Sequence, residues 1–219
     1  MGDGDYGINT GSVERICAQI KDLKELKIET AIVVGGGNIF RGLNAAERGM
    51  DRVTADNMGM LATLVNSLAL MDQLEQMGIY TRVMSAVKVE AFAEPYIRRR
   101  AVRHMEKGRL VILAAGTGNP YFSTDTAASL RAMEVGAELL IKATKVDGVY
   151  SADPVKVKDA VFYKQLSYMD VLTKQLKVMD LTAISLLQDN KIPVRVVDIN
   201  APNVLRRVVM GEEVGSLIS

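Results

Sequence analysis

The residues with the clearest capacity for chemistry form the run Gly35-Gly36-Gly37-Asn38-Ile39-Phe40-Arg41-Gly42. Three consecutive glycines carry no Cβ atoms, so their backbone N–H groups can approach an anion closely. The planar guanidinium of Arg41 adds a charged fork that suits phosphate oxygens. The apolar stretch 30–34, which precedes the run, is typical of a buried strand. Together these features predict a phosphate-binding loop that follows a strand.

This loop departs from two common phosphate-binding patterns. Gly37 and Gly42 have the outer spacing of a Walker A loop, but Leu43 and Asn44 stand where that motif has Lys and Ser or Thr. Phe40 occupies the third glycine position of the dinucleotide-binding pattern. A tight strand-to-helix turn without a ligand is the alternative, and three glycines with Asn and Arg favour phosphate binding over it.

A second loop, residues 115–126, gathers polar side chains after an apolar strand predicted at 109–115. Its hydroxyls, amide and two aromatic rings offer hydrogen-bonding groups for a base and a ribose, and a surface for stacking. Ser123, Thr124 and Asp125 are also good N-cap residues, so helix capping is the simpler explanation for these three. We favour binding for the loop as a whole, because a turn alone does not require so many polar groups.

A third stretch follows a strand predicted at 138–143. Lys142 and Lys145 lie near the end of this strand, where they could face phosphates, and Tyr150 with Asp153 could hold a purine. Taken alone this evidence is weak, because Asp-Gly and Asp-Pro pairs of the kind found here are common in turns and loops.

Helical and strand patterns alternate along the chain. Helices are predicted at 13–23, 53–77, 93–107, 125–135, 170–176, 180–190 and 202–209, and strands at 30–34, 79–85, 109–115, 138–143 and 194–199. This alternation indicates an α/β protein whose sheet is mainly parallel and covered by helices on both faces. In such sheets ligands bind beyond the carboxyl ends of the strands, where both glycine-containing loops fall.

Composition limits the classes of protein to consider. The 219 residues contain 48% hydrophobic and 24% charged residues, which is ordinary for a globular protein. A net charge of +1 gives no reason to expect nucleic acid or an anionic membrane as a partner. No apolar run reaches membrane-spanning length, and the N-terminus lacks the features of a signal peptide, so we expect a cytoplasmic protein. No linker long enough to separate domains is evident, which favours a single domain over 1–219.

Neither the single cysteine nor the single histidine is expected to act in catalysis. Cys17 lies among apolar helix positions and is expected to fill the core. His104 lies in a basic helical segment, where a solvated face is the expected position rather than a metal site or a general base. The nearby Arg98-Arg99-Arg100, with Arg103 and Lys107, is likewise expected to form a solvated helix face.

Taken together, the loops resemble those of the bacterial UMP kinases (uridylate kinases) of the amino acid kinase family. The matching motifs, in the family's order and spacing, are GGGNIFRG, RVTADNMGMLAT, AGTGNPYFSTD, KATKVDGVY, KVMD and RRVVMG. The resemblance covers essentially the whole chain. Acetylglutamate, aspartate and carbamate kinases share the fold but not the first and third of these motifs.

The resemblance implies a fold and an activity. The fold is a three-layer αβα sandwich with a mainly parallel central sheet. The activity is transfer of the γ-phosphoryl group of ATP, with Mg²⁺, to UMP, which gives UDP and ADP in pyrimidine nucleotide biosynthesis. Members of the family are typically homohexamers that are activated by GTP and inhibited by UTP.

The resemblance also implies roles for individual residues. Those expected to hold UMP are Gly36, Asp56, Thr117, Gly118, Asn119, Pro120, Tyr121, Phe122, Ser123 and Thr124. Those expected to bind ATP are Gly37, Arg41, Thr144, Tyr150 and Asp153, with Gly37 and Arg41 along the phosphates. The side chains expected nearest the reaction are Arg41, Asp125 and Asp180. Both aspartates also stand where helices begin, so capping is their alternative role.

The N-terminus departs from the family pattern. Family members open with a strand that carries a Lys-x-Ser-Gly-Glu motif, whose lysine and glycine meet the ATP phosphates. Residues 1–7 of this chain begin about where that motif ends. We therefore expect the chain to lack the family's first strand, the natural protein to be longer, and the activity of this short form to be in question.

Two alternatives to an active UMP kinase remain open. A non-catalytic regulatory protein would keep the uridine nucleotide pocket without transferring phosphate. A related kinase that acts on a carboxylate or carbamate would need a small acceptor pocket, which the polar and aromatic loop at 116–125 argues against.

Overall fold

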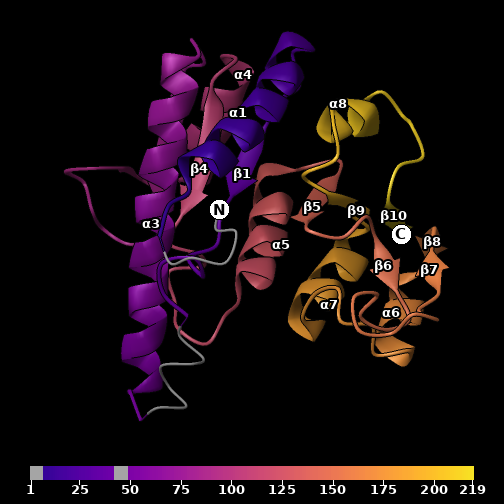
Figure 1. The fold of residues 1–219 in the computed structure, drawn as a ribbon. Coiled ribbons are helices and arrows are strands. Elements are labelled where there is room, and N and C mark those ends of the chain that lie inside the picture. The colour runs from indigo at the N-terminus through magenta and orange to yellow at the C-terminus, as the bar shows by residue number, and fades with distance from the viewer. Residues whose placement is uncertain (1–6, 42–48) are drawn as a thin grey trace. The chain divides into compact units, whose positions relative to one another are not determined.

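The computed structural model describes residues 7–41 and 49–219 of the chain (Figure 1). The stretches 1–6 and 42–48 lie outside the described residues, and with them lie the last position of the glycine-rich run and most of the segment where the family's N-terminal motif would end.

The chain divides into two compact units. Unit 1 is Met1–Ala127 and unit 2 is Ala128–Ser219, so the boundary falls within helix α5 (Thr124–Val135). Each unit contains a four-stranded sheet, and most of the strand pairs are parallel. This confirms the predicted α/β class with a mainly parallel sheet. The expectation of a single domain over 1–219 stays a prediction.

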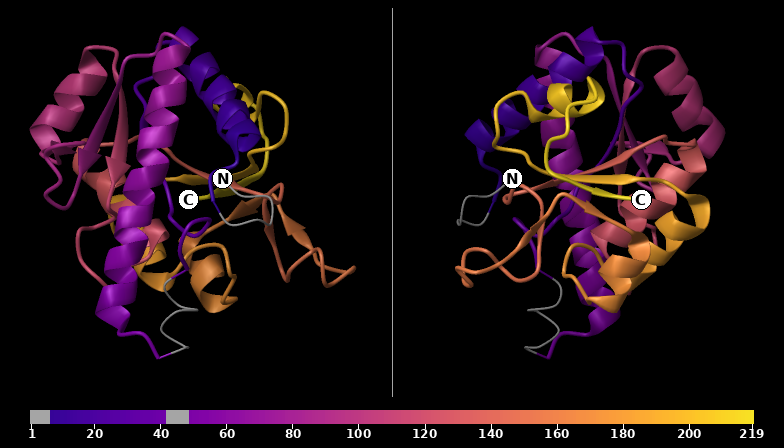
Figure 2. Two further views of the ribbon diagram at one scale, coloured as in Figure 1. Left: turned by 60° about the vertical axis from the view of Figure 1, so that its left-hand side comes forward. Right: turned by 90° about the vertical axis from the view of Figure 1, so that its right-hand side faces the viewer.

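Unit 1 is built on a fully parallel sheet in the order β1-β4-β2-β3. Its described elements before α5 are α1 (Thr10–Glu25), β1 (Ala31–Val33), α3 (Arg52–Gln76), β2 (Thr81–Ser85), β3 (Glu94–Pro95), α4 (Arg98–Glu106) and β4 (Leu110–Ala114). All five residues of β4 are buried, because strands pair with it on both sides and helices cover it. Figure 2 shows α3 and α4 on opposite faces of this sheet.

The two long helices of unit 1 begin at side chains that cap them. The Asn9 carboxamide oxygen accepts the Ser12 N–H at the start of α1, and the Asp51 carboxylate accepts the Thr54 N–H at the start of α3. α1 packs on α3 through an apolar stripe that includes the fully buried Cys17. Among the described residues, no helix, α3 included, is both long and apolar enough to span a membrane.

Unit 2 is built on a sheet in the order β5-β9-β10-β8, in which only the β9–β10 pair is antiparallel. Its described elements after α5 are β5 (Leu140–Thr144), β6 (Val149–Tyr150), β7 (Phe162–Tyr163), β8 (Gln165–Leu166), α6 (Tyr168–Thr173), α7 (Leu181–Asn190), β9 (Val194–Asp198), α8 (Val204–Val209) and β10 (Ser216–Ile218). Strands β6 and β7 form a separate antiparallel ribbon. The apolar core gathers Ile184 and Leu187 of α7 with Val194 and Val196 of β9 and Ile218 of β10.

Three predictions about the elements require correction. The helix predicted at 93–107 begins only at Arg98, because Pro95 favours an extended residue before it and Glu94–Pro95 pairs with β2 instead. The strand predicted at 30–34 is half-buried rather than buried, since among the described strands β1 pairs only with β4. The helix predicted from 170 begins at Tyr168, because Ser167 and Asp170 form a capping box.

The burial of Cys17 leads to a test of how α1 packs. The side chain is 0% exposed, and burial raises the pKa of its thiol to about 12. Since the thiolate is the reactive form, we expect a disulfide reagent at pH 8 to leave the folded protein unmodified. In denaturant, where the thiol pKa returns to about 8.5, one thiol per chain should react rapidly. Rapid labelling of the folded protein, followed by absorbance, would contradict the packing of α1 on α3.

Candidate functional site

Helix α3 holds the glycine loop through a buried asparagine. Asn66 is 0% exposed, and its Nδ2 donates to the Gly35 carbonyl at 2.8 Å and to Asn38 Oδ1 at 2.6 Å. Asn38 Nδ2 donates back to Asn66 Oδ1 at 3.1 Å and to the Gly7 carbonyl at 2.9 Å. The glycine loop is therefore fixed to the middle of α3 by a reciprocal amide pair. Sequence reasoning missed Asn66, although a buried amide within an apolar helical pattern was a usable signal.

The three glycines of this loop have different surroundings. A Cβ on Gly36 would lie 2.7 Å from the Gly59 carbonyl oxygen and 2.8 Å from the Ala62 Cβ, both on α3. A Cβ on Gly35 would lie 3.3 Å from Thr124 Oγ1, whereas a Cβ on Gly37 would meet nothing within 4 Å. Close packing on α3 therefore requires glycine at position 36, and the described surroundings do not require it at position 37.

Arg41 lies on the glycine loop itself. Its Nε donates to the Gly37 carbonyl at 3.1 Å, and the residue is exposed. Within the part of the chain that the structure describes, the terminal guanidinium nitrogens have no hydrogen-bond partner. These nitrogens could therefore donate to an anion, and the role of Arg41 in phosphate binding stays a prediction.

The second loop is tied to the same helix at two points. The buried Thr63 of α3 accepts the Ala115 N–H at 2.8 Å through Oγ1. Further along the loop, the Tyr121 N–H donates to Asp56 Oδ2 at 2.7 Å. Ala115 and Tyr121 both have positive φ, at 62° and 72°, which is uncommon for residues other than glycine. The two hydrogen bonds thus hold Ala115 and Tyr121 in a left-handed backbone conformation that residues other than glycine seldom adopt.

The middle of the second loop presents polar and aromatic groups to solvent. Tyr121 and Phe122 are 64% and 53% exposed. Thr117 Oγ1 donates to the Asn119 carbonyl and accepts the Asn119 N–H, both at 3.2 Å. Ser123 Oγ accepts the Thr126 N–H at 3.0 Å and caps α5, which confirms the capping role for Ser123. The other candidates of this loop, Gly118, Pro120, Thr124 and Asp125, lie between or beside these residues.

Unit 1 therefore brings together the residues predicted to hold UMP. Strands β1 and β4 are adjacent and parallel, with Val33 opposite Leu113, so the loops that follow them leave the same edge of the sheet. Asp56, on the second turn of α3, is hydrogen-bonded to the second loop, and Gly36 contacts α3 from the first loop. Ligand sites of open parallel sheets lie at this kind of edge.

The residues predicted to bind ATP in unit 2 lie in and beside the loop after β5. Thr144 Oγ1 donates to the Val146 carbonyl at 2.6 Å and accepts its N–H at 3.0 Å. The Tyr150 hydroxyl donates to Asp147 Oδ1 at 2.7 Å, and this hydrogen bond raises the pKa of the Tyr150 phenol. The Tyr150 ring meets the Phe162 ring edge-on at a centroid distance of 5.3 Å. Sequence reasoning missed Phe162, because the pairing of β6 with β7 brings it there.

Two predicted carboxylates of unit 2 make local hydrogen bonds. Asp153 Oδ1 accepts the Val155 N–H at 3.0 Å, and its Oδ2 lies 3.7 Å from the Lys156 ammonium. Asp180 caps α7, since its Oδ1 accepts the Ala183 N–H at 3.0 Å. The capping role considered for Asp180 is therefore confirmed, and its role in the reaction stays a prediction.

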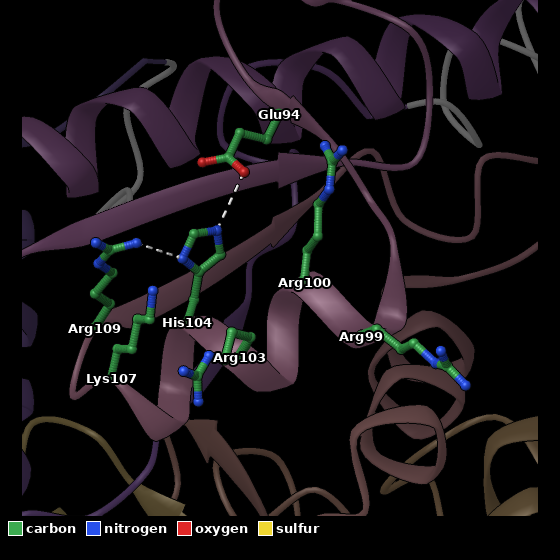
Figure 3. Close-up of a pocket in the computed structure, with 7 residues that line it drawn as sticks. All are labelled: Glu94, Arg99, Arg100, Arg103, His104, Lys107 and Arg109. Carbon is green, nitrogen blue, oxygen red and sulfur yellow. Dashed lines mark hydrogen bonds and ion pairs between the residues drawn. The ribbon is translucent and has the colours of Figure 1, made fainter.

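A basic pocket lies beside α4, away from these loops in the sequence (Figure 3). Its volume is about 420 Å³, and its lining residues are Glu94, Arg99, Arg100, Arg103, His104, Lys107 and Arg109. The predicted solvated face of α4 is confirmed for the exposed Arg98, Arg99, Arg100, Arg103 and Lys107.

The prediction of a solvated His104 is wrong. Its side chain is only 13% exposed and lies between Arg109, 3.0 Å from Nδ1, and Glu94, 3.1 Å from Nε2. A guanidinium can only donate, so Nδ1 accepts and Nε2–H donates to the carboxylate. Both ring nitrogens are thus engaged, and neither is available as a general base or a metal ligand.

The glycine loop offers a matched pair of substitutions. We expect Gly36→Ala to lower the free energy of unfolding by about 1–3 kcal/mol, because the new methyl group meets the α3 backbone. A methyl group on Gly37 would meet open space, so Gly37→Ala should change the free energy of unfolding by less than about 0.5 kcal/mol. Urea unfolding of both variants measures this difference. Equal stability of the two would show that the loop does not pack on α3 as described.

Comparisons with known proteins show the family to which the chain belongs. The model of the amino acid kinase family matches residues 3–198. The UMP kinase of Bacillus anthracis is 42% identical, with a TM-score of 0.96 over 99% of this chain and 90% of that one. The UMP kinase of Ureaplasma parvum is 37% identical, with a TM-score of 0.92 over 100% and 93%. The uridylate kinase of Archaeoglobus fulgidus is 29% identical, with a TM-score of 0.75 over 96% and 94%. This chain belongs to the amino acid kinase family, within which it is similar to UMP kinases.

Proposed function

We propose that this protein transfers the γ-phosphoryl group of ATP to UMP, with release of UDP and ADP. The observation that carries the proposal is the attachment of the glycine loop and the 115–124 loop to one helix at one edge of the unit 1 sheet. Two solved structures named UMP kinase, each more than a third identical to this chain, support the choice of acceptor.

In this proposal UMP binds to unit 1. Gly36 lets the glycine loop lie against α3, and Asp56 accepts hydrogen bonds from the nucleoside. The second loop contributes Thr117, Gly118, Asn119, Pro120, Tyr121, Phe122, Ser123 and Thr124. Its amide and hydroxyl groups both donate and accept, as recognition of a uracil edge requires, and its aromatic rings provide stacking surfaces.

ATP is assigned to the remaining predicted residues. Thr144, Tyr150 and Asp153 would hold the adenosine part, where the Tyr150 and Phe162 rings offer apolar surface to a purine. Gly37 and Arg41 would contact phosphate oxygens. The unpartnered guanidinium nitrogens of Arg41, among the described residues, support this assignment.

Phosphoryl transfer depends on positioning and on neutralising charge rather than on a covalent intermediate. Arg41 is suited to stabilise charge on the transferred group, and Asp125 and Asp180 would orient groups near the reaction. Mg²⁺ supplies further neutralisation when it is bound to the phosphates of ATP. Among the described residues no cluster of three His, Cys, Asp or Glu side chains could hold a metal ion. Mg²⁺ at phosphoryl-transfer sites usually keeps several water ligands and is bound through substrate phosphates and one or two carboxylates.

The regulatory and cellular features implied by the resemblance are part of the proposal. We propose a homohexamer in the cytoplasm that GTP activates and UTP inhibits. Light scattering with and without each nucleotide, alongside activity measurements, tests both points. A monomer whose activity is unchanged by either nucleotide would contradict them without affecting the proposed reaction.

The reaction itself is tested by coupled measurement of ADP release from MgATP with and without UMP. We expect release that depends on UMP, and a loss of about 10²- to 10³-fold in kcat for Arg41→Ala, because a preorganised cation is removed from the transferred group. Arg206→Ala, which removes an exposed arginine of α8, is the matched control.

Two further measurements separate the alternatives. A version extended upstream by any encoded Lys-x-Ser-Gly segment shows whether activity needs that lysine. Binding of UMP by calorimetry without turnover in either version would favour the non-catalytic regulatory protein. Failure of both versions to bind UMP would contradict the proposed function.

A further inference from the structure

We propose that Arg52 is a positioning residue of the nucleoside site. It fixes the Asp56 carboxylate and the Tyr121 segment together, so that Asp56 Oδ1 is the oxygen offered to the ribose hydroxyls. The inference rests on the proposed function, because it requires that unit 1 binds UMP. No role was predicted for Arg52 from the sequence.

The three residues form a closed set of contacts. Arg52 Nε donates to Asp56 Oδ2 at 2.8 Å, one turn along α3. The Tyr121 N–H donates to the same oxygen at 2.7 Å. The Arg52 guanidinium carbon lies 5.5 Å from the centroid of the Tyr121 ring, within the range of a cation–π contact. Arg52 therefore contacts both the Asp56 carboxylate and Tyr121, whose N–H donates to that carboxylate.

These contacts give the two oxygens of the Asp56 carboxylate different hydrogen-bond partners. Oδ2 accepts two hydrogen bonds, and Oδ1 accepts none from residues 7–41 or 49–219. The Asp56 side chain is only 17% exposed. A carboxylate rotates between two equivalent states unless its oxygens have different partners. Arg52 supplies one of the two bonds that make them different.

The chemistry of UMP indicates what Oδ1 would accept. An ionised carboxylate only accepts hydrogen bonds, and the ribose of UMP presents two neighbouring hydroxyl donors. The uracil edge mixes donors and acceptors, which suits the amide and hydroxyl groups of Thr117 and Asn119 better. A hydroxyl bound to a charged acceptor forms one of the stronger classes of hydrogen bond.

Arg52 also supports an unfavourable backbone conformation. Tyr121 has φ of 72°, which a residue with a side chain adopts only when its surroundings hold it there. The backbone is held by Asp56 and the ring by Arg52. Loss of Arg52 would remove the contact with the Tyr121 ring and one hydrogen bond to the Asp56 carboxylate. Each nucleotide that binds would then have to order the second loop.

A purely structural role for Arg52 makes a different prediction. An ion pair between residues four apart on a helix usually has a small effect on stability and none on ligand selectivity. Lys174 provides the matched control, because it pairs with Asp170 at 3.1 Å four residues away and lies 5.1 Å from the Tyr163 ring centroid. It therefore combines the same two interactions in unit 2, in residues that have no proposed role in binding.

The test compares the affinity for UMP with that for UMP lacking the 2′ or the 3′ hydroxyl, by calorimetry, in the wild-type chain, Arg52→Ala, Arg52→Lys and Lys174→Ala. We expect Arg52→Ala to weaken UMP binding about tenfold or more and to weaken binding of at least one deoxynucleotide much less. Arg52→Lys should recover part of the loss, since it keeps a charge beside Asp56. Lys174→Ala should bind all three nucleotides as the wild type does. In turnover, Arg52→Ala should raise KM for UMP with little change in kcat.

The outcomes separate this inference from the proposed function. If the wild-type chain does not bind UMP, the proposed function fails. If it does bind UMP, equal losses for all three nucleotides, or no loss, in Arg52→Ala would overturn the role of Arg52 while leaving the function intact. If Arg52→Ala does not fold, Arg52→Lys decides, because its smaller loss should show the same dependence on the ribose hydroxyls.

Discussion

The candidate site of unit 1 depends on a few polar side chains of one helix. Asn66 holds the glycine loop, while Thr63 and Asp56 hold the second loop at its start and in its middle. Thr63 and Asn66 are buried, so leaving their hydrogen-bond partners unpaired would be costly. Because the apolar face of α3 packs on the sheet, the same element transmits the rigidity of the core to both loops.

These hydrogen bonds order two loops that contain glycines. Glycine-rich segments gain freedom in the unfolded chain and would be poorly ordered by their own contacts. Here each loop is pinned at positions that leave its intervening groups exposed, including the Arg41 guanidinium and the rings of Tyr121 and Phe122. In unit 2 the hydrogen bonds that order the candidate residues are more local, since Thr144 and Asp153 bond to backbone groups two residues away.

The sequence was sufficient where a signal is local. Long apolar periodicities predicted α1, α3, α7 and β4, and the glycine and polar loops stood out by composition. Strands β6, β7, β8 and β10, of two or three residues, were not predicted because no periodicity fits in such a length. Asn66 was missed because its partners Gly35 and Asn38 come from a distant segment, and the contact of Arg52 with the Tyr121 ring likewise joins distant segments. His104 was misplaced for the same reason, since its local neighbours are basic whereas Glu94 reaches it from β3.

In the glycine run, packing on α3 and the proposed anion binding involve different residues. Glycine at position 36 is required by the approach to Gly59 and Ala62, whatever the ligand. In the proposed function, anion binding rests on the exposed Gly37 and on Arg41, whose Nε donates to the Gly37 carbonyl. A cation held in place before the substrate arrives needs little reorganisation when charge develops. The shape of the loop thus comes from α3 and its charge from Arg41, so the two properties can be changed independently.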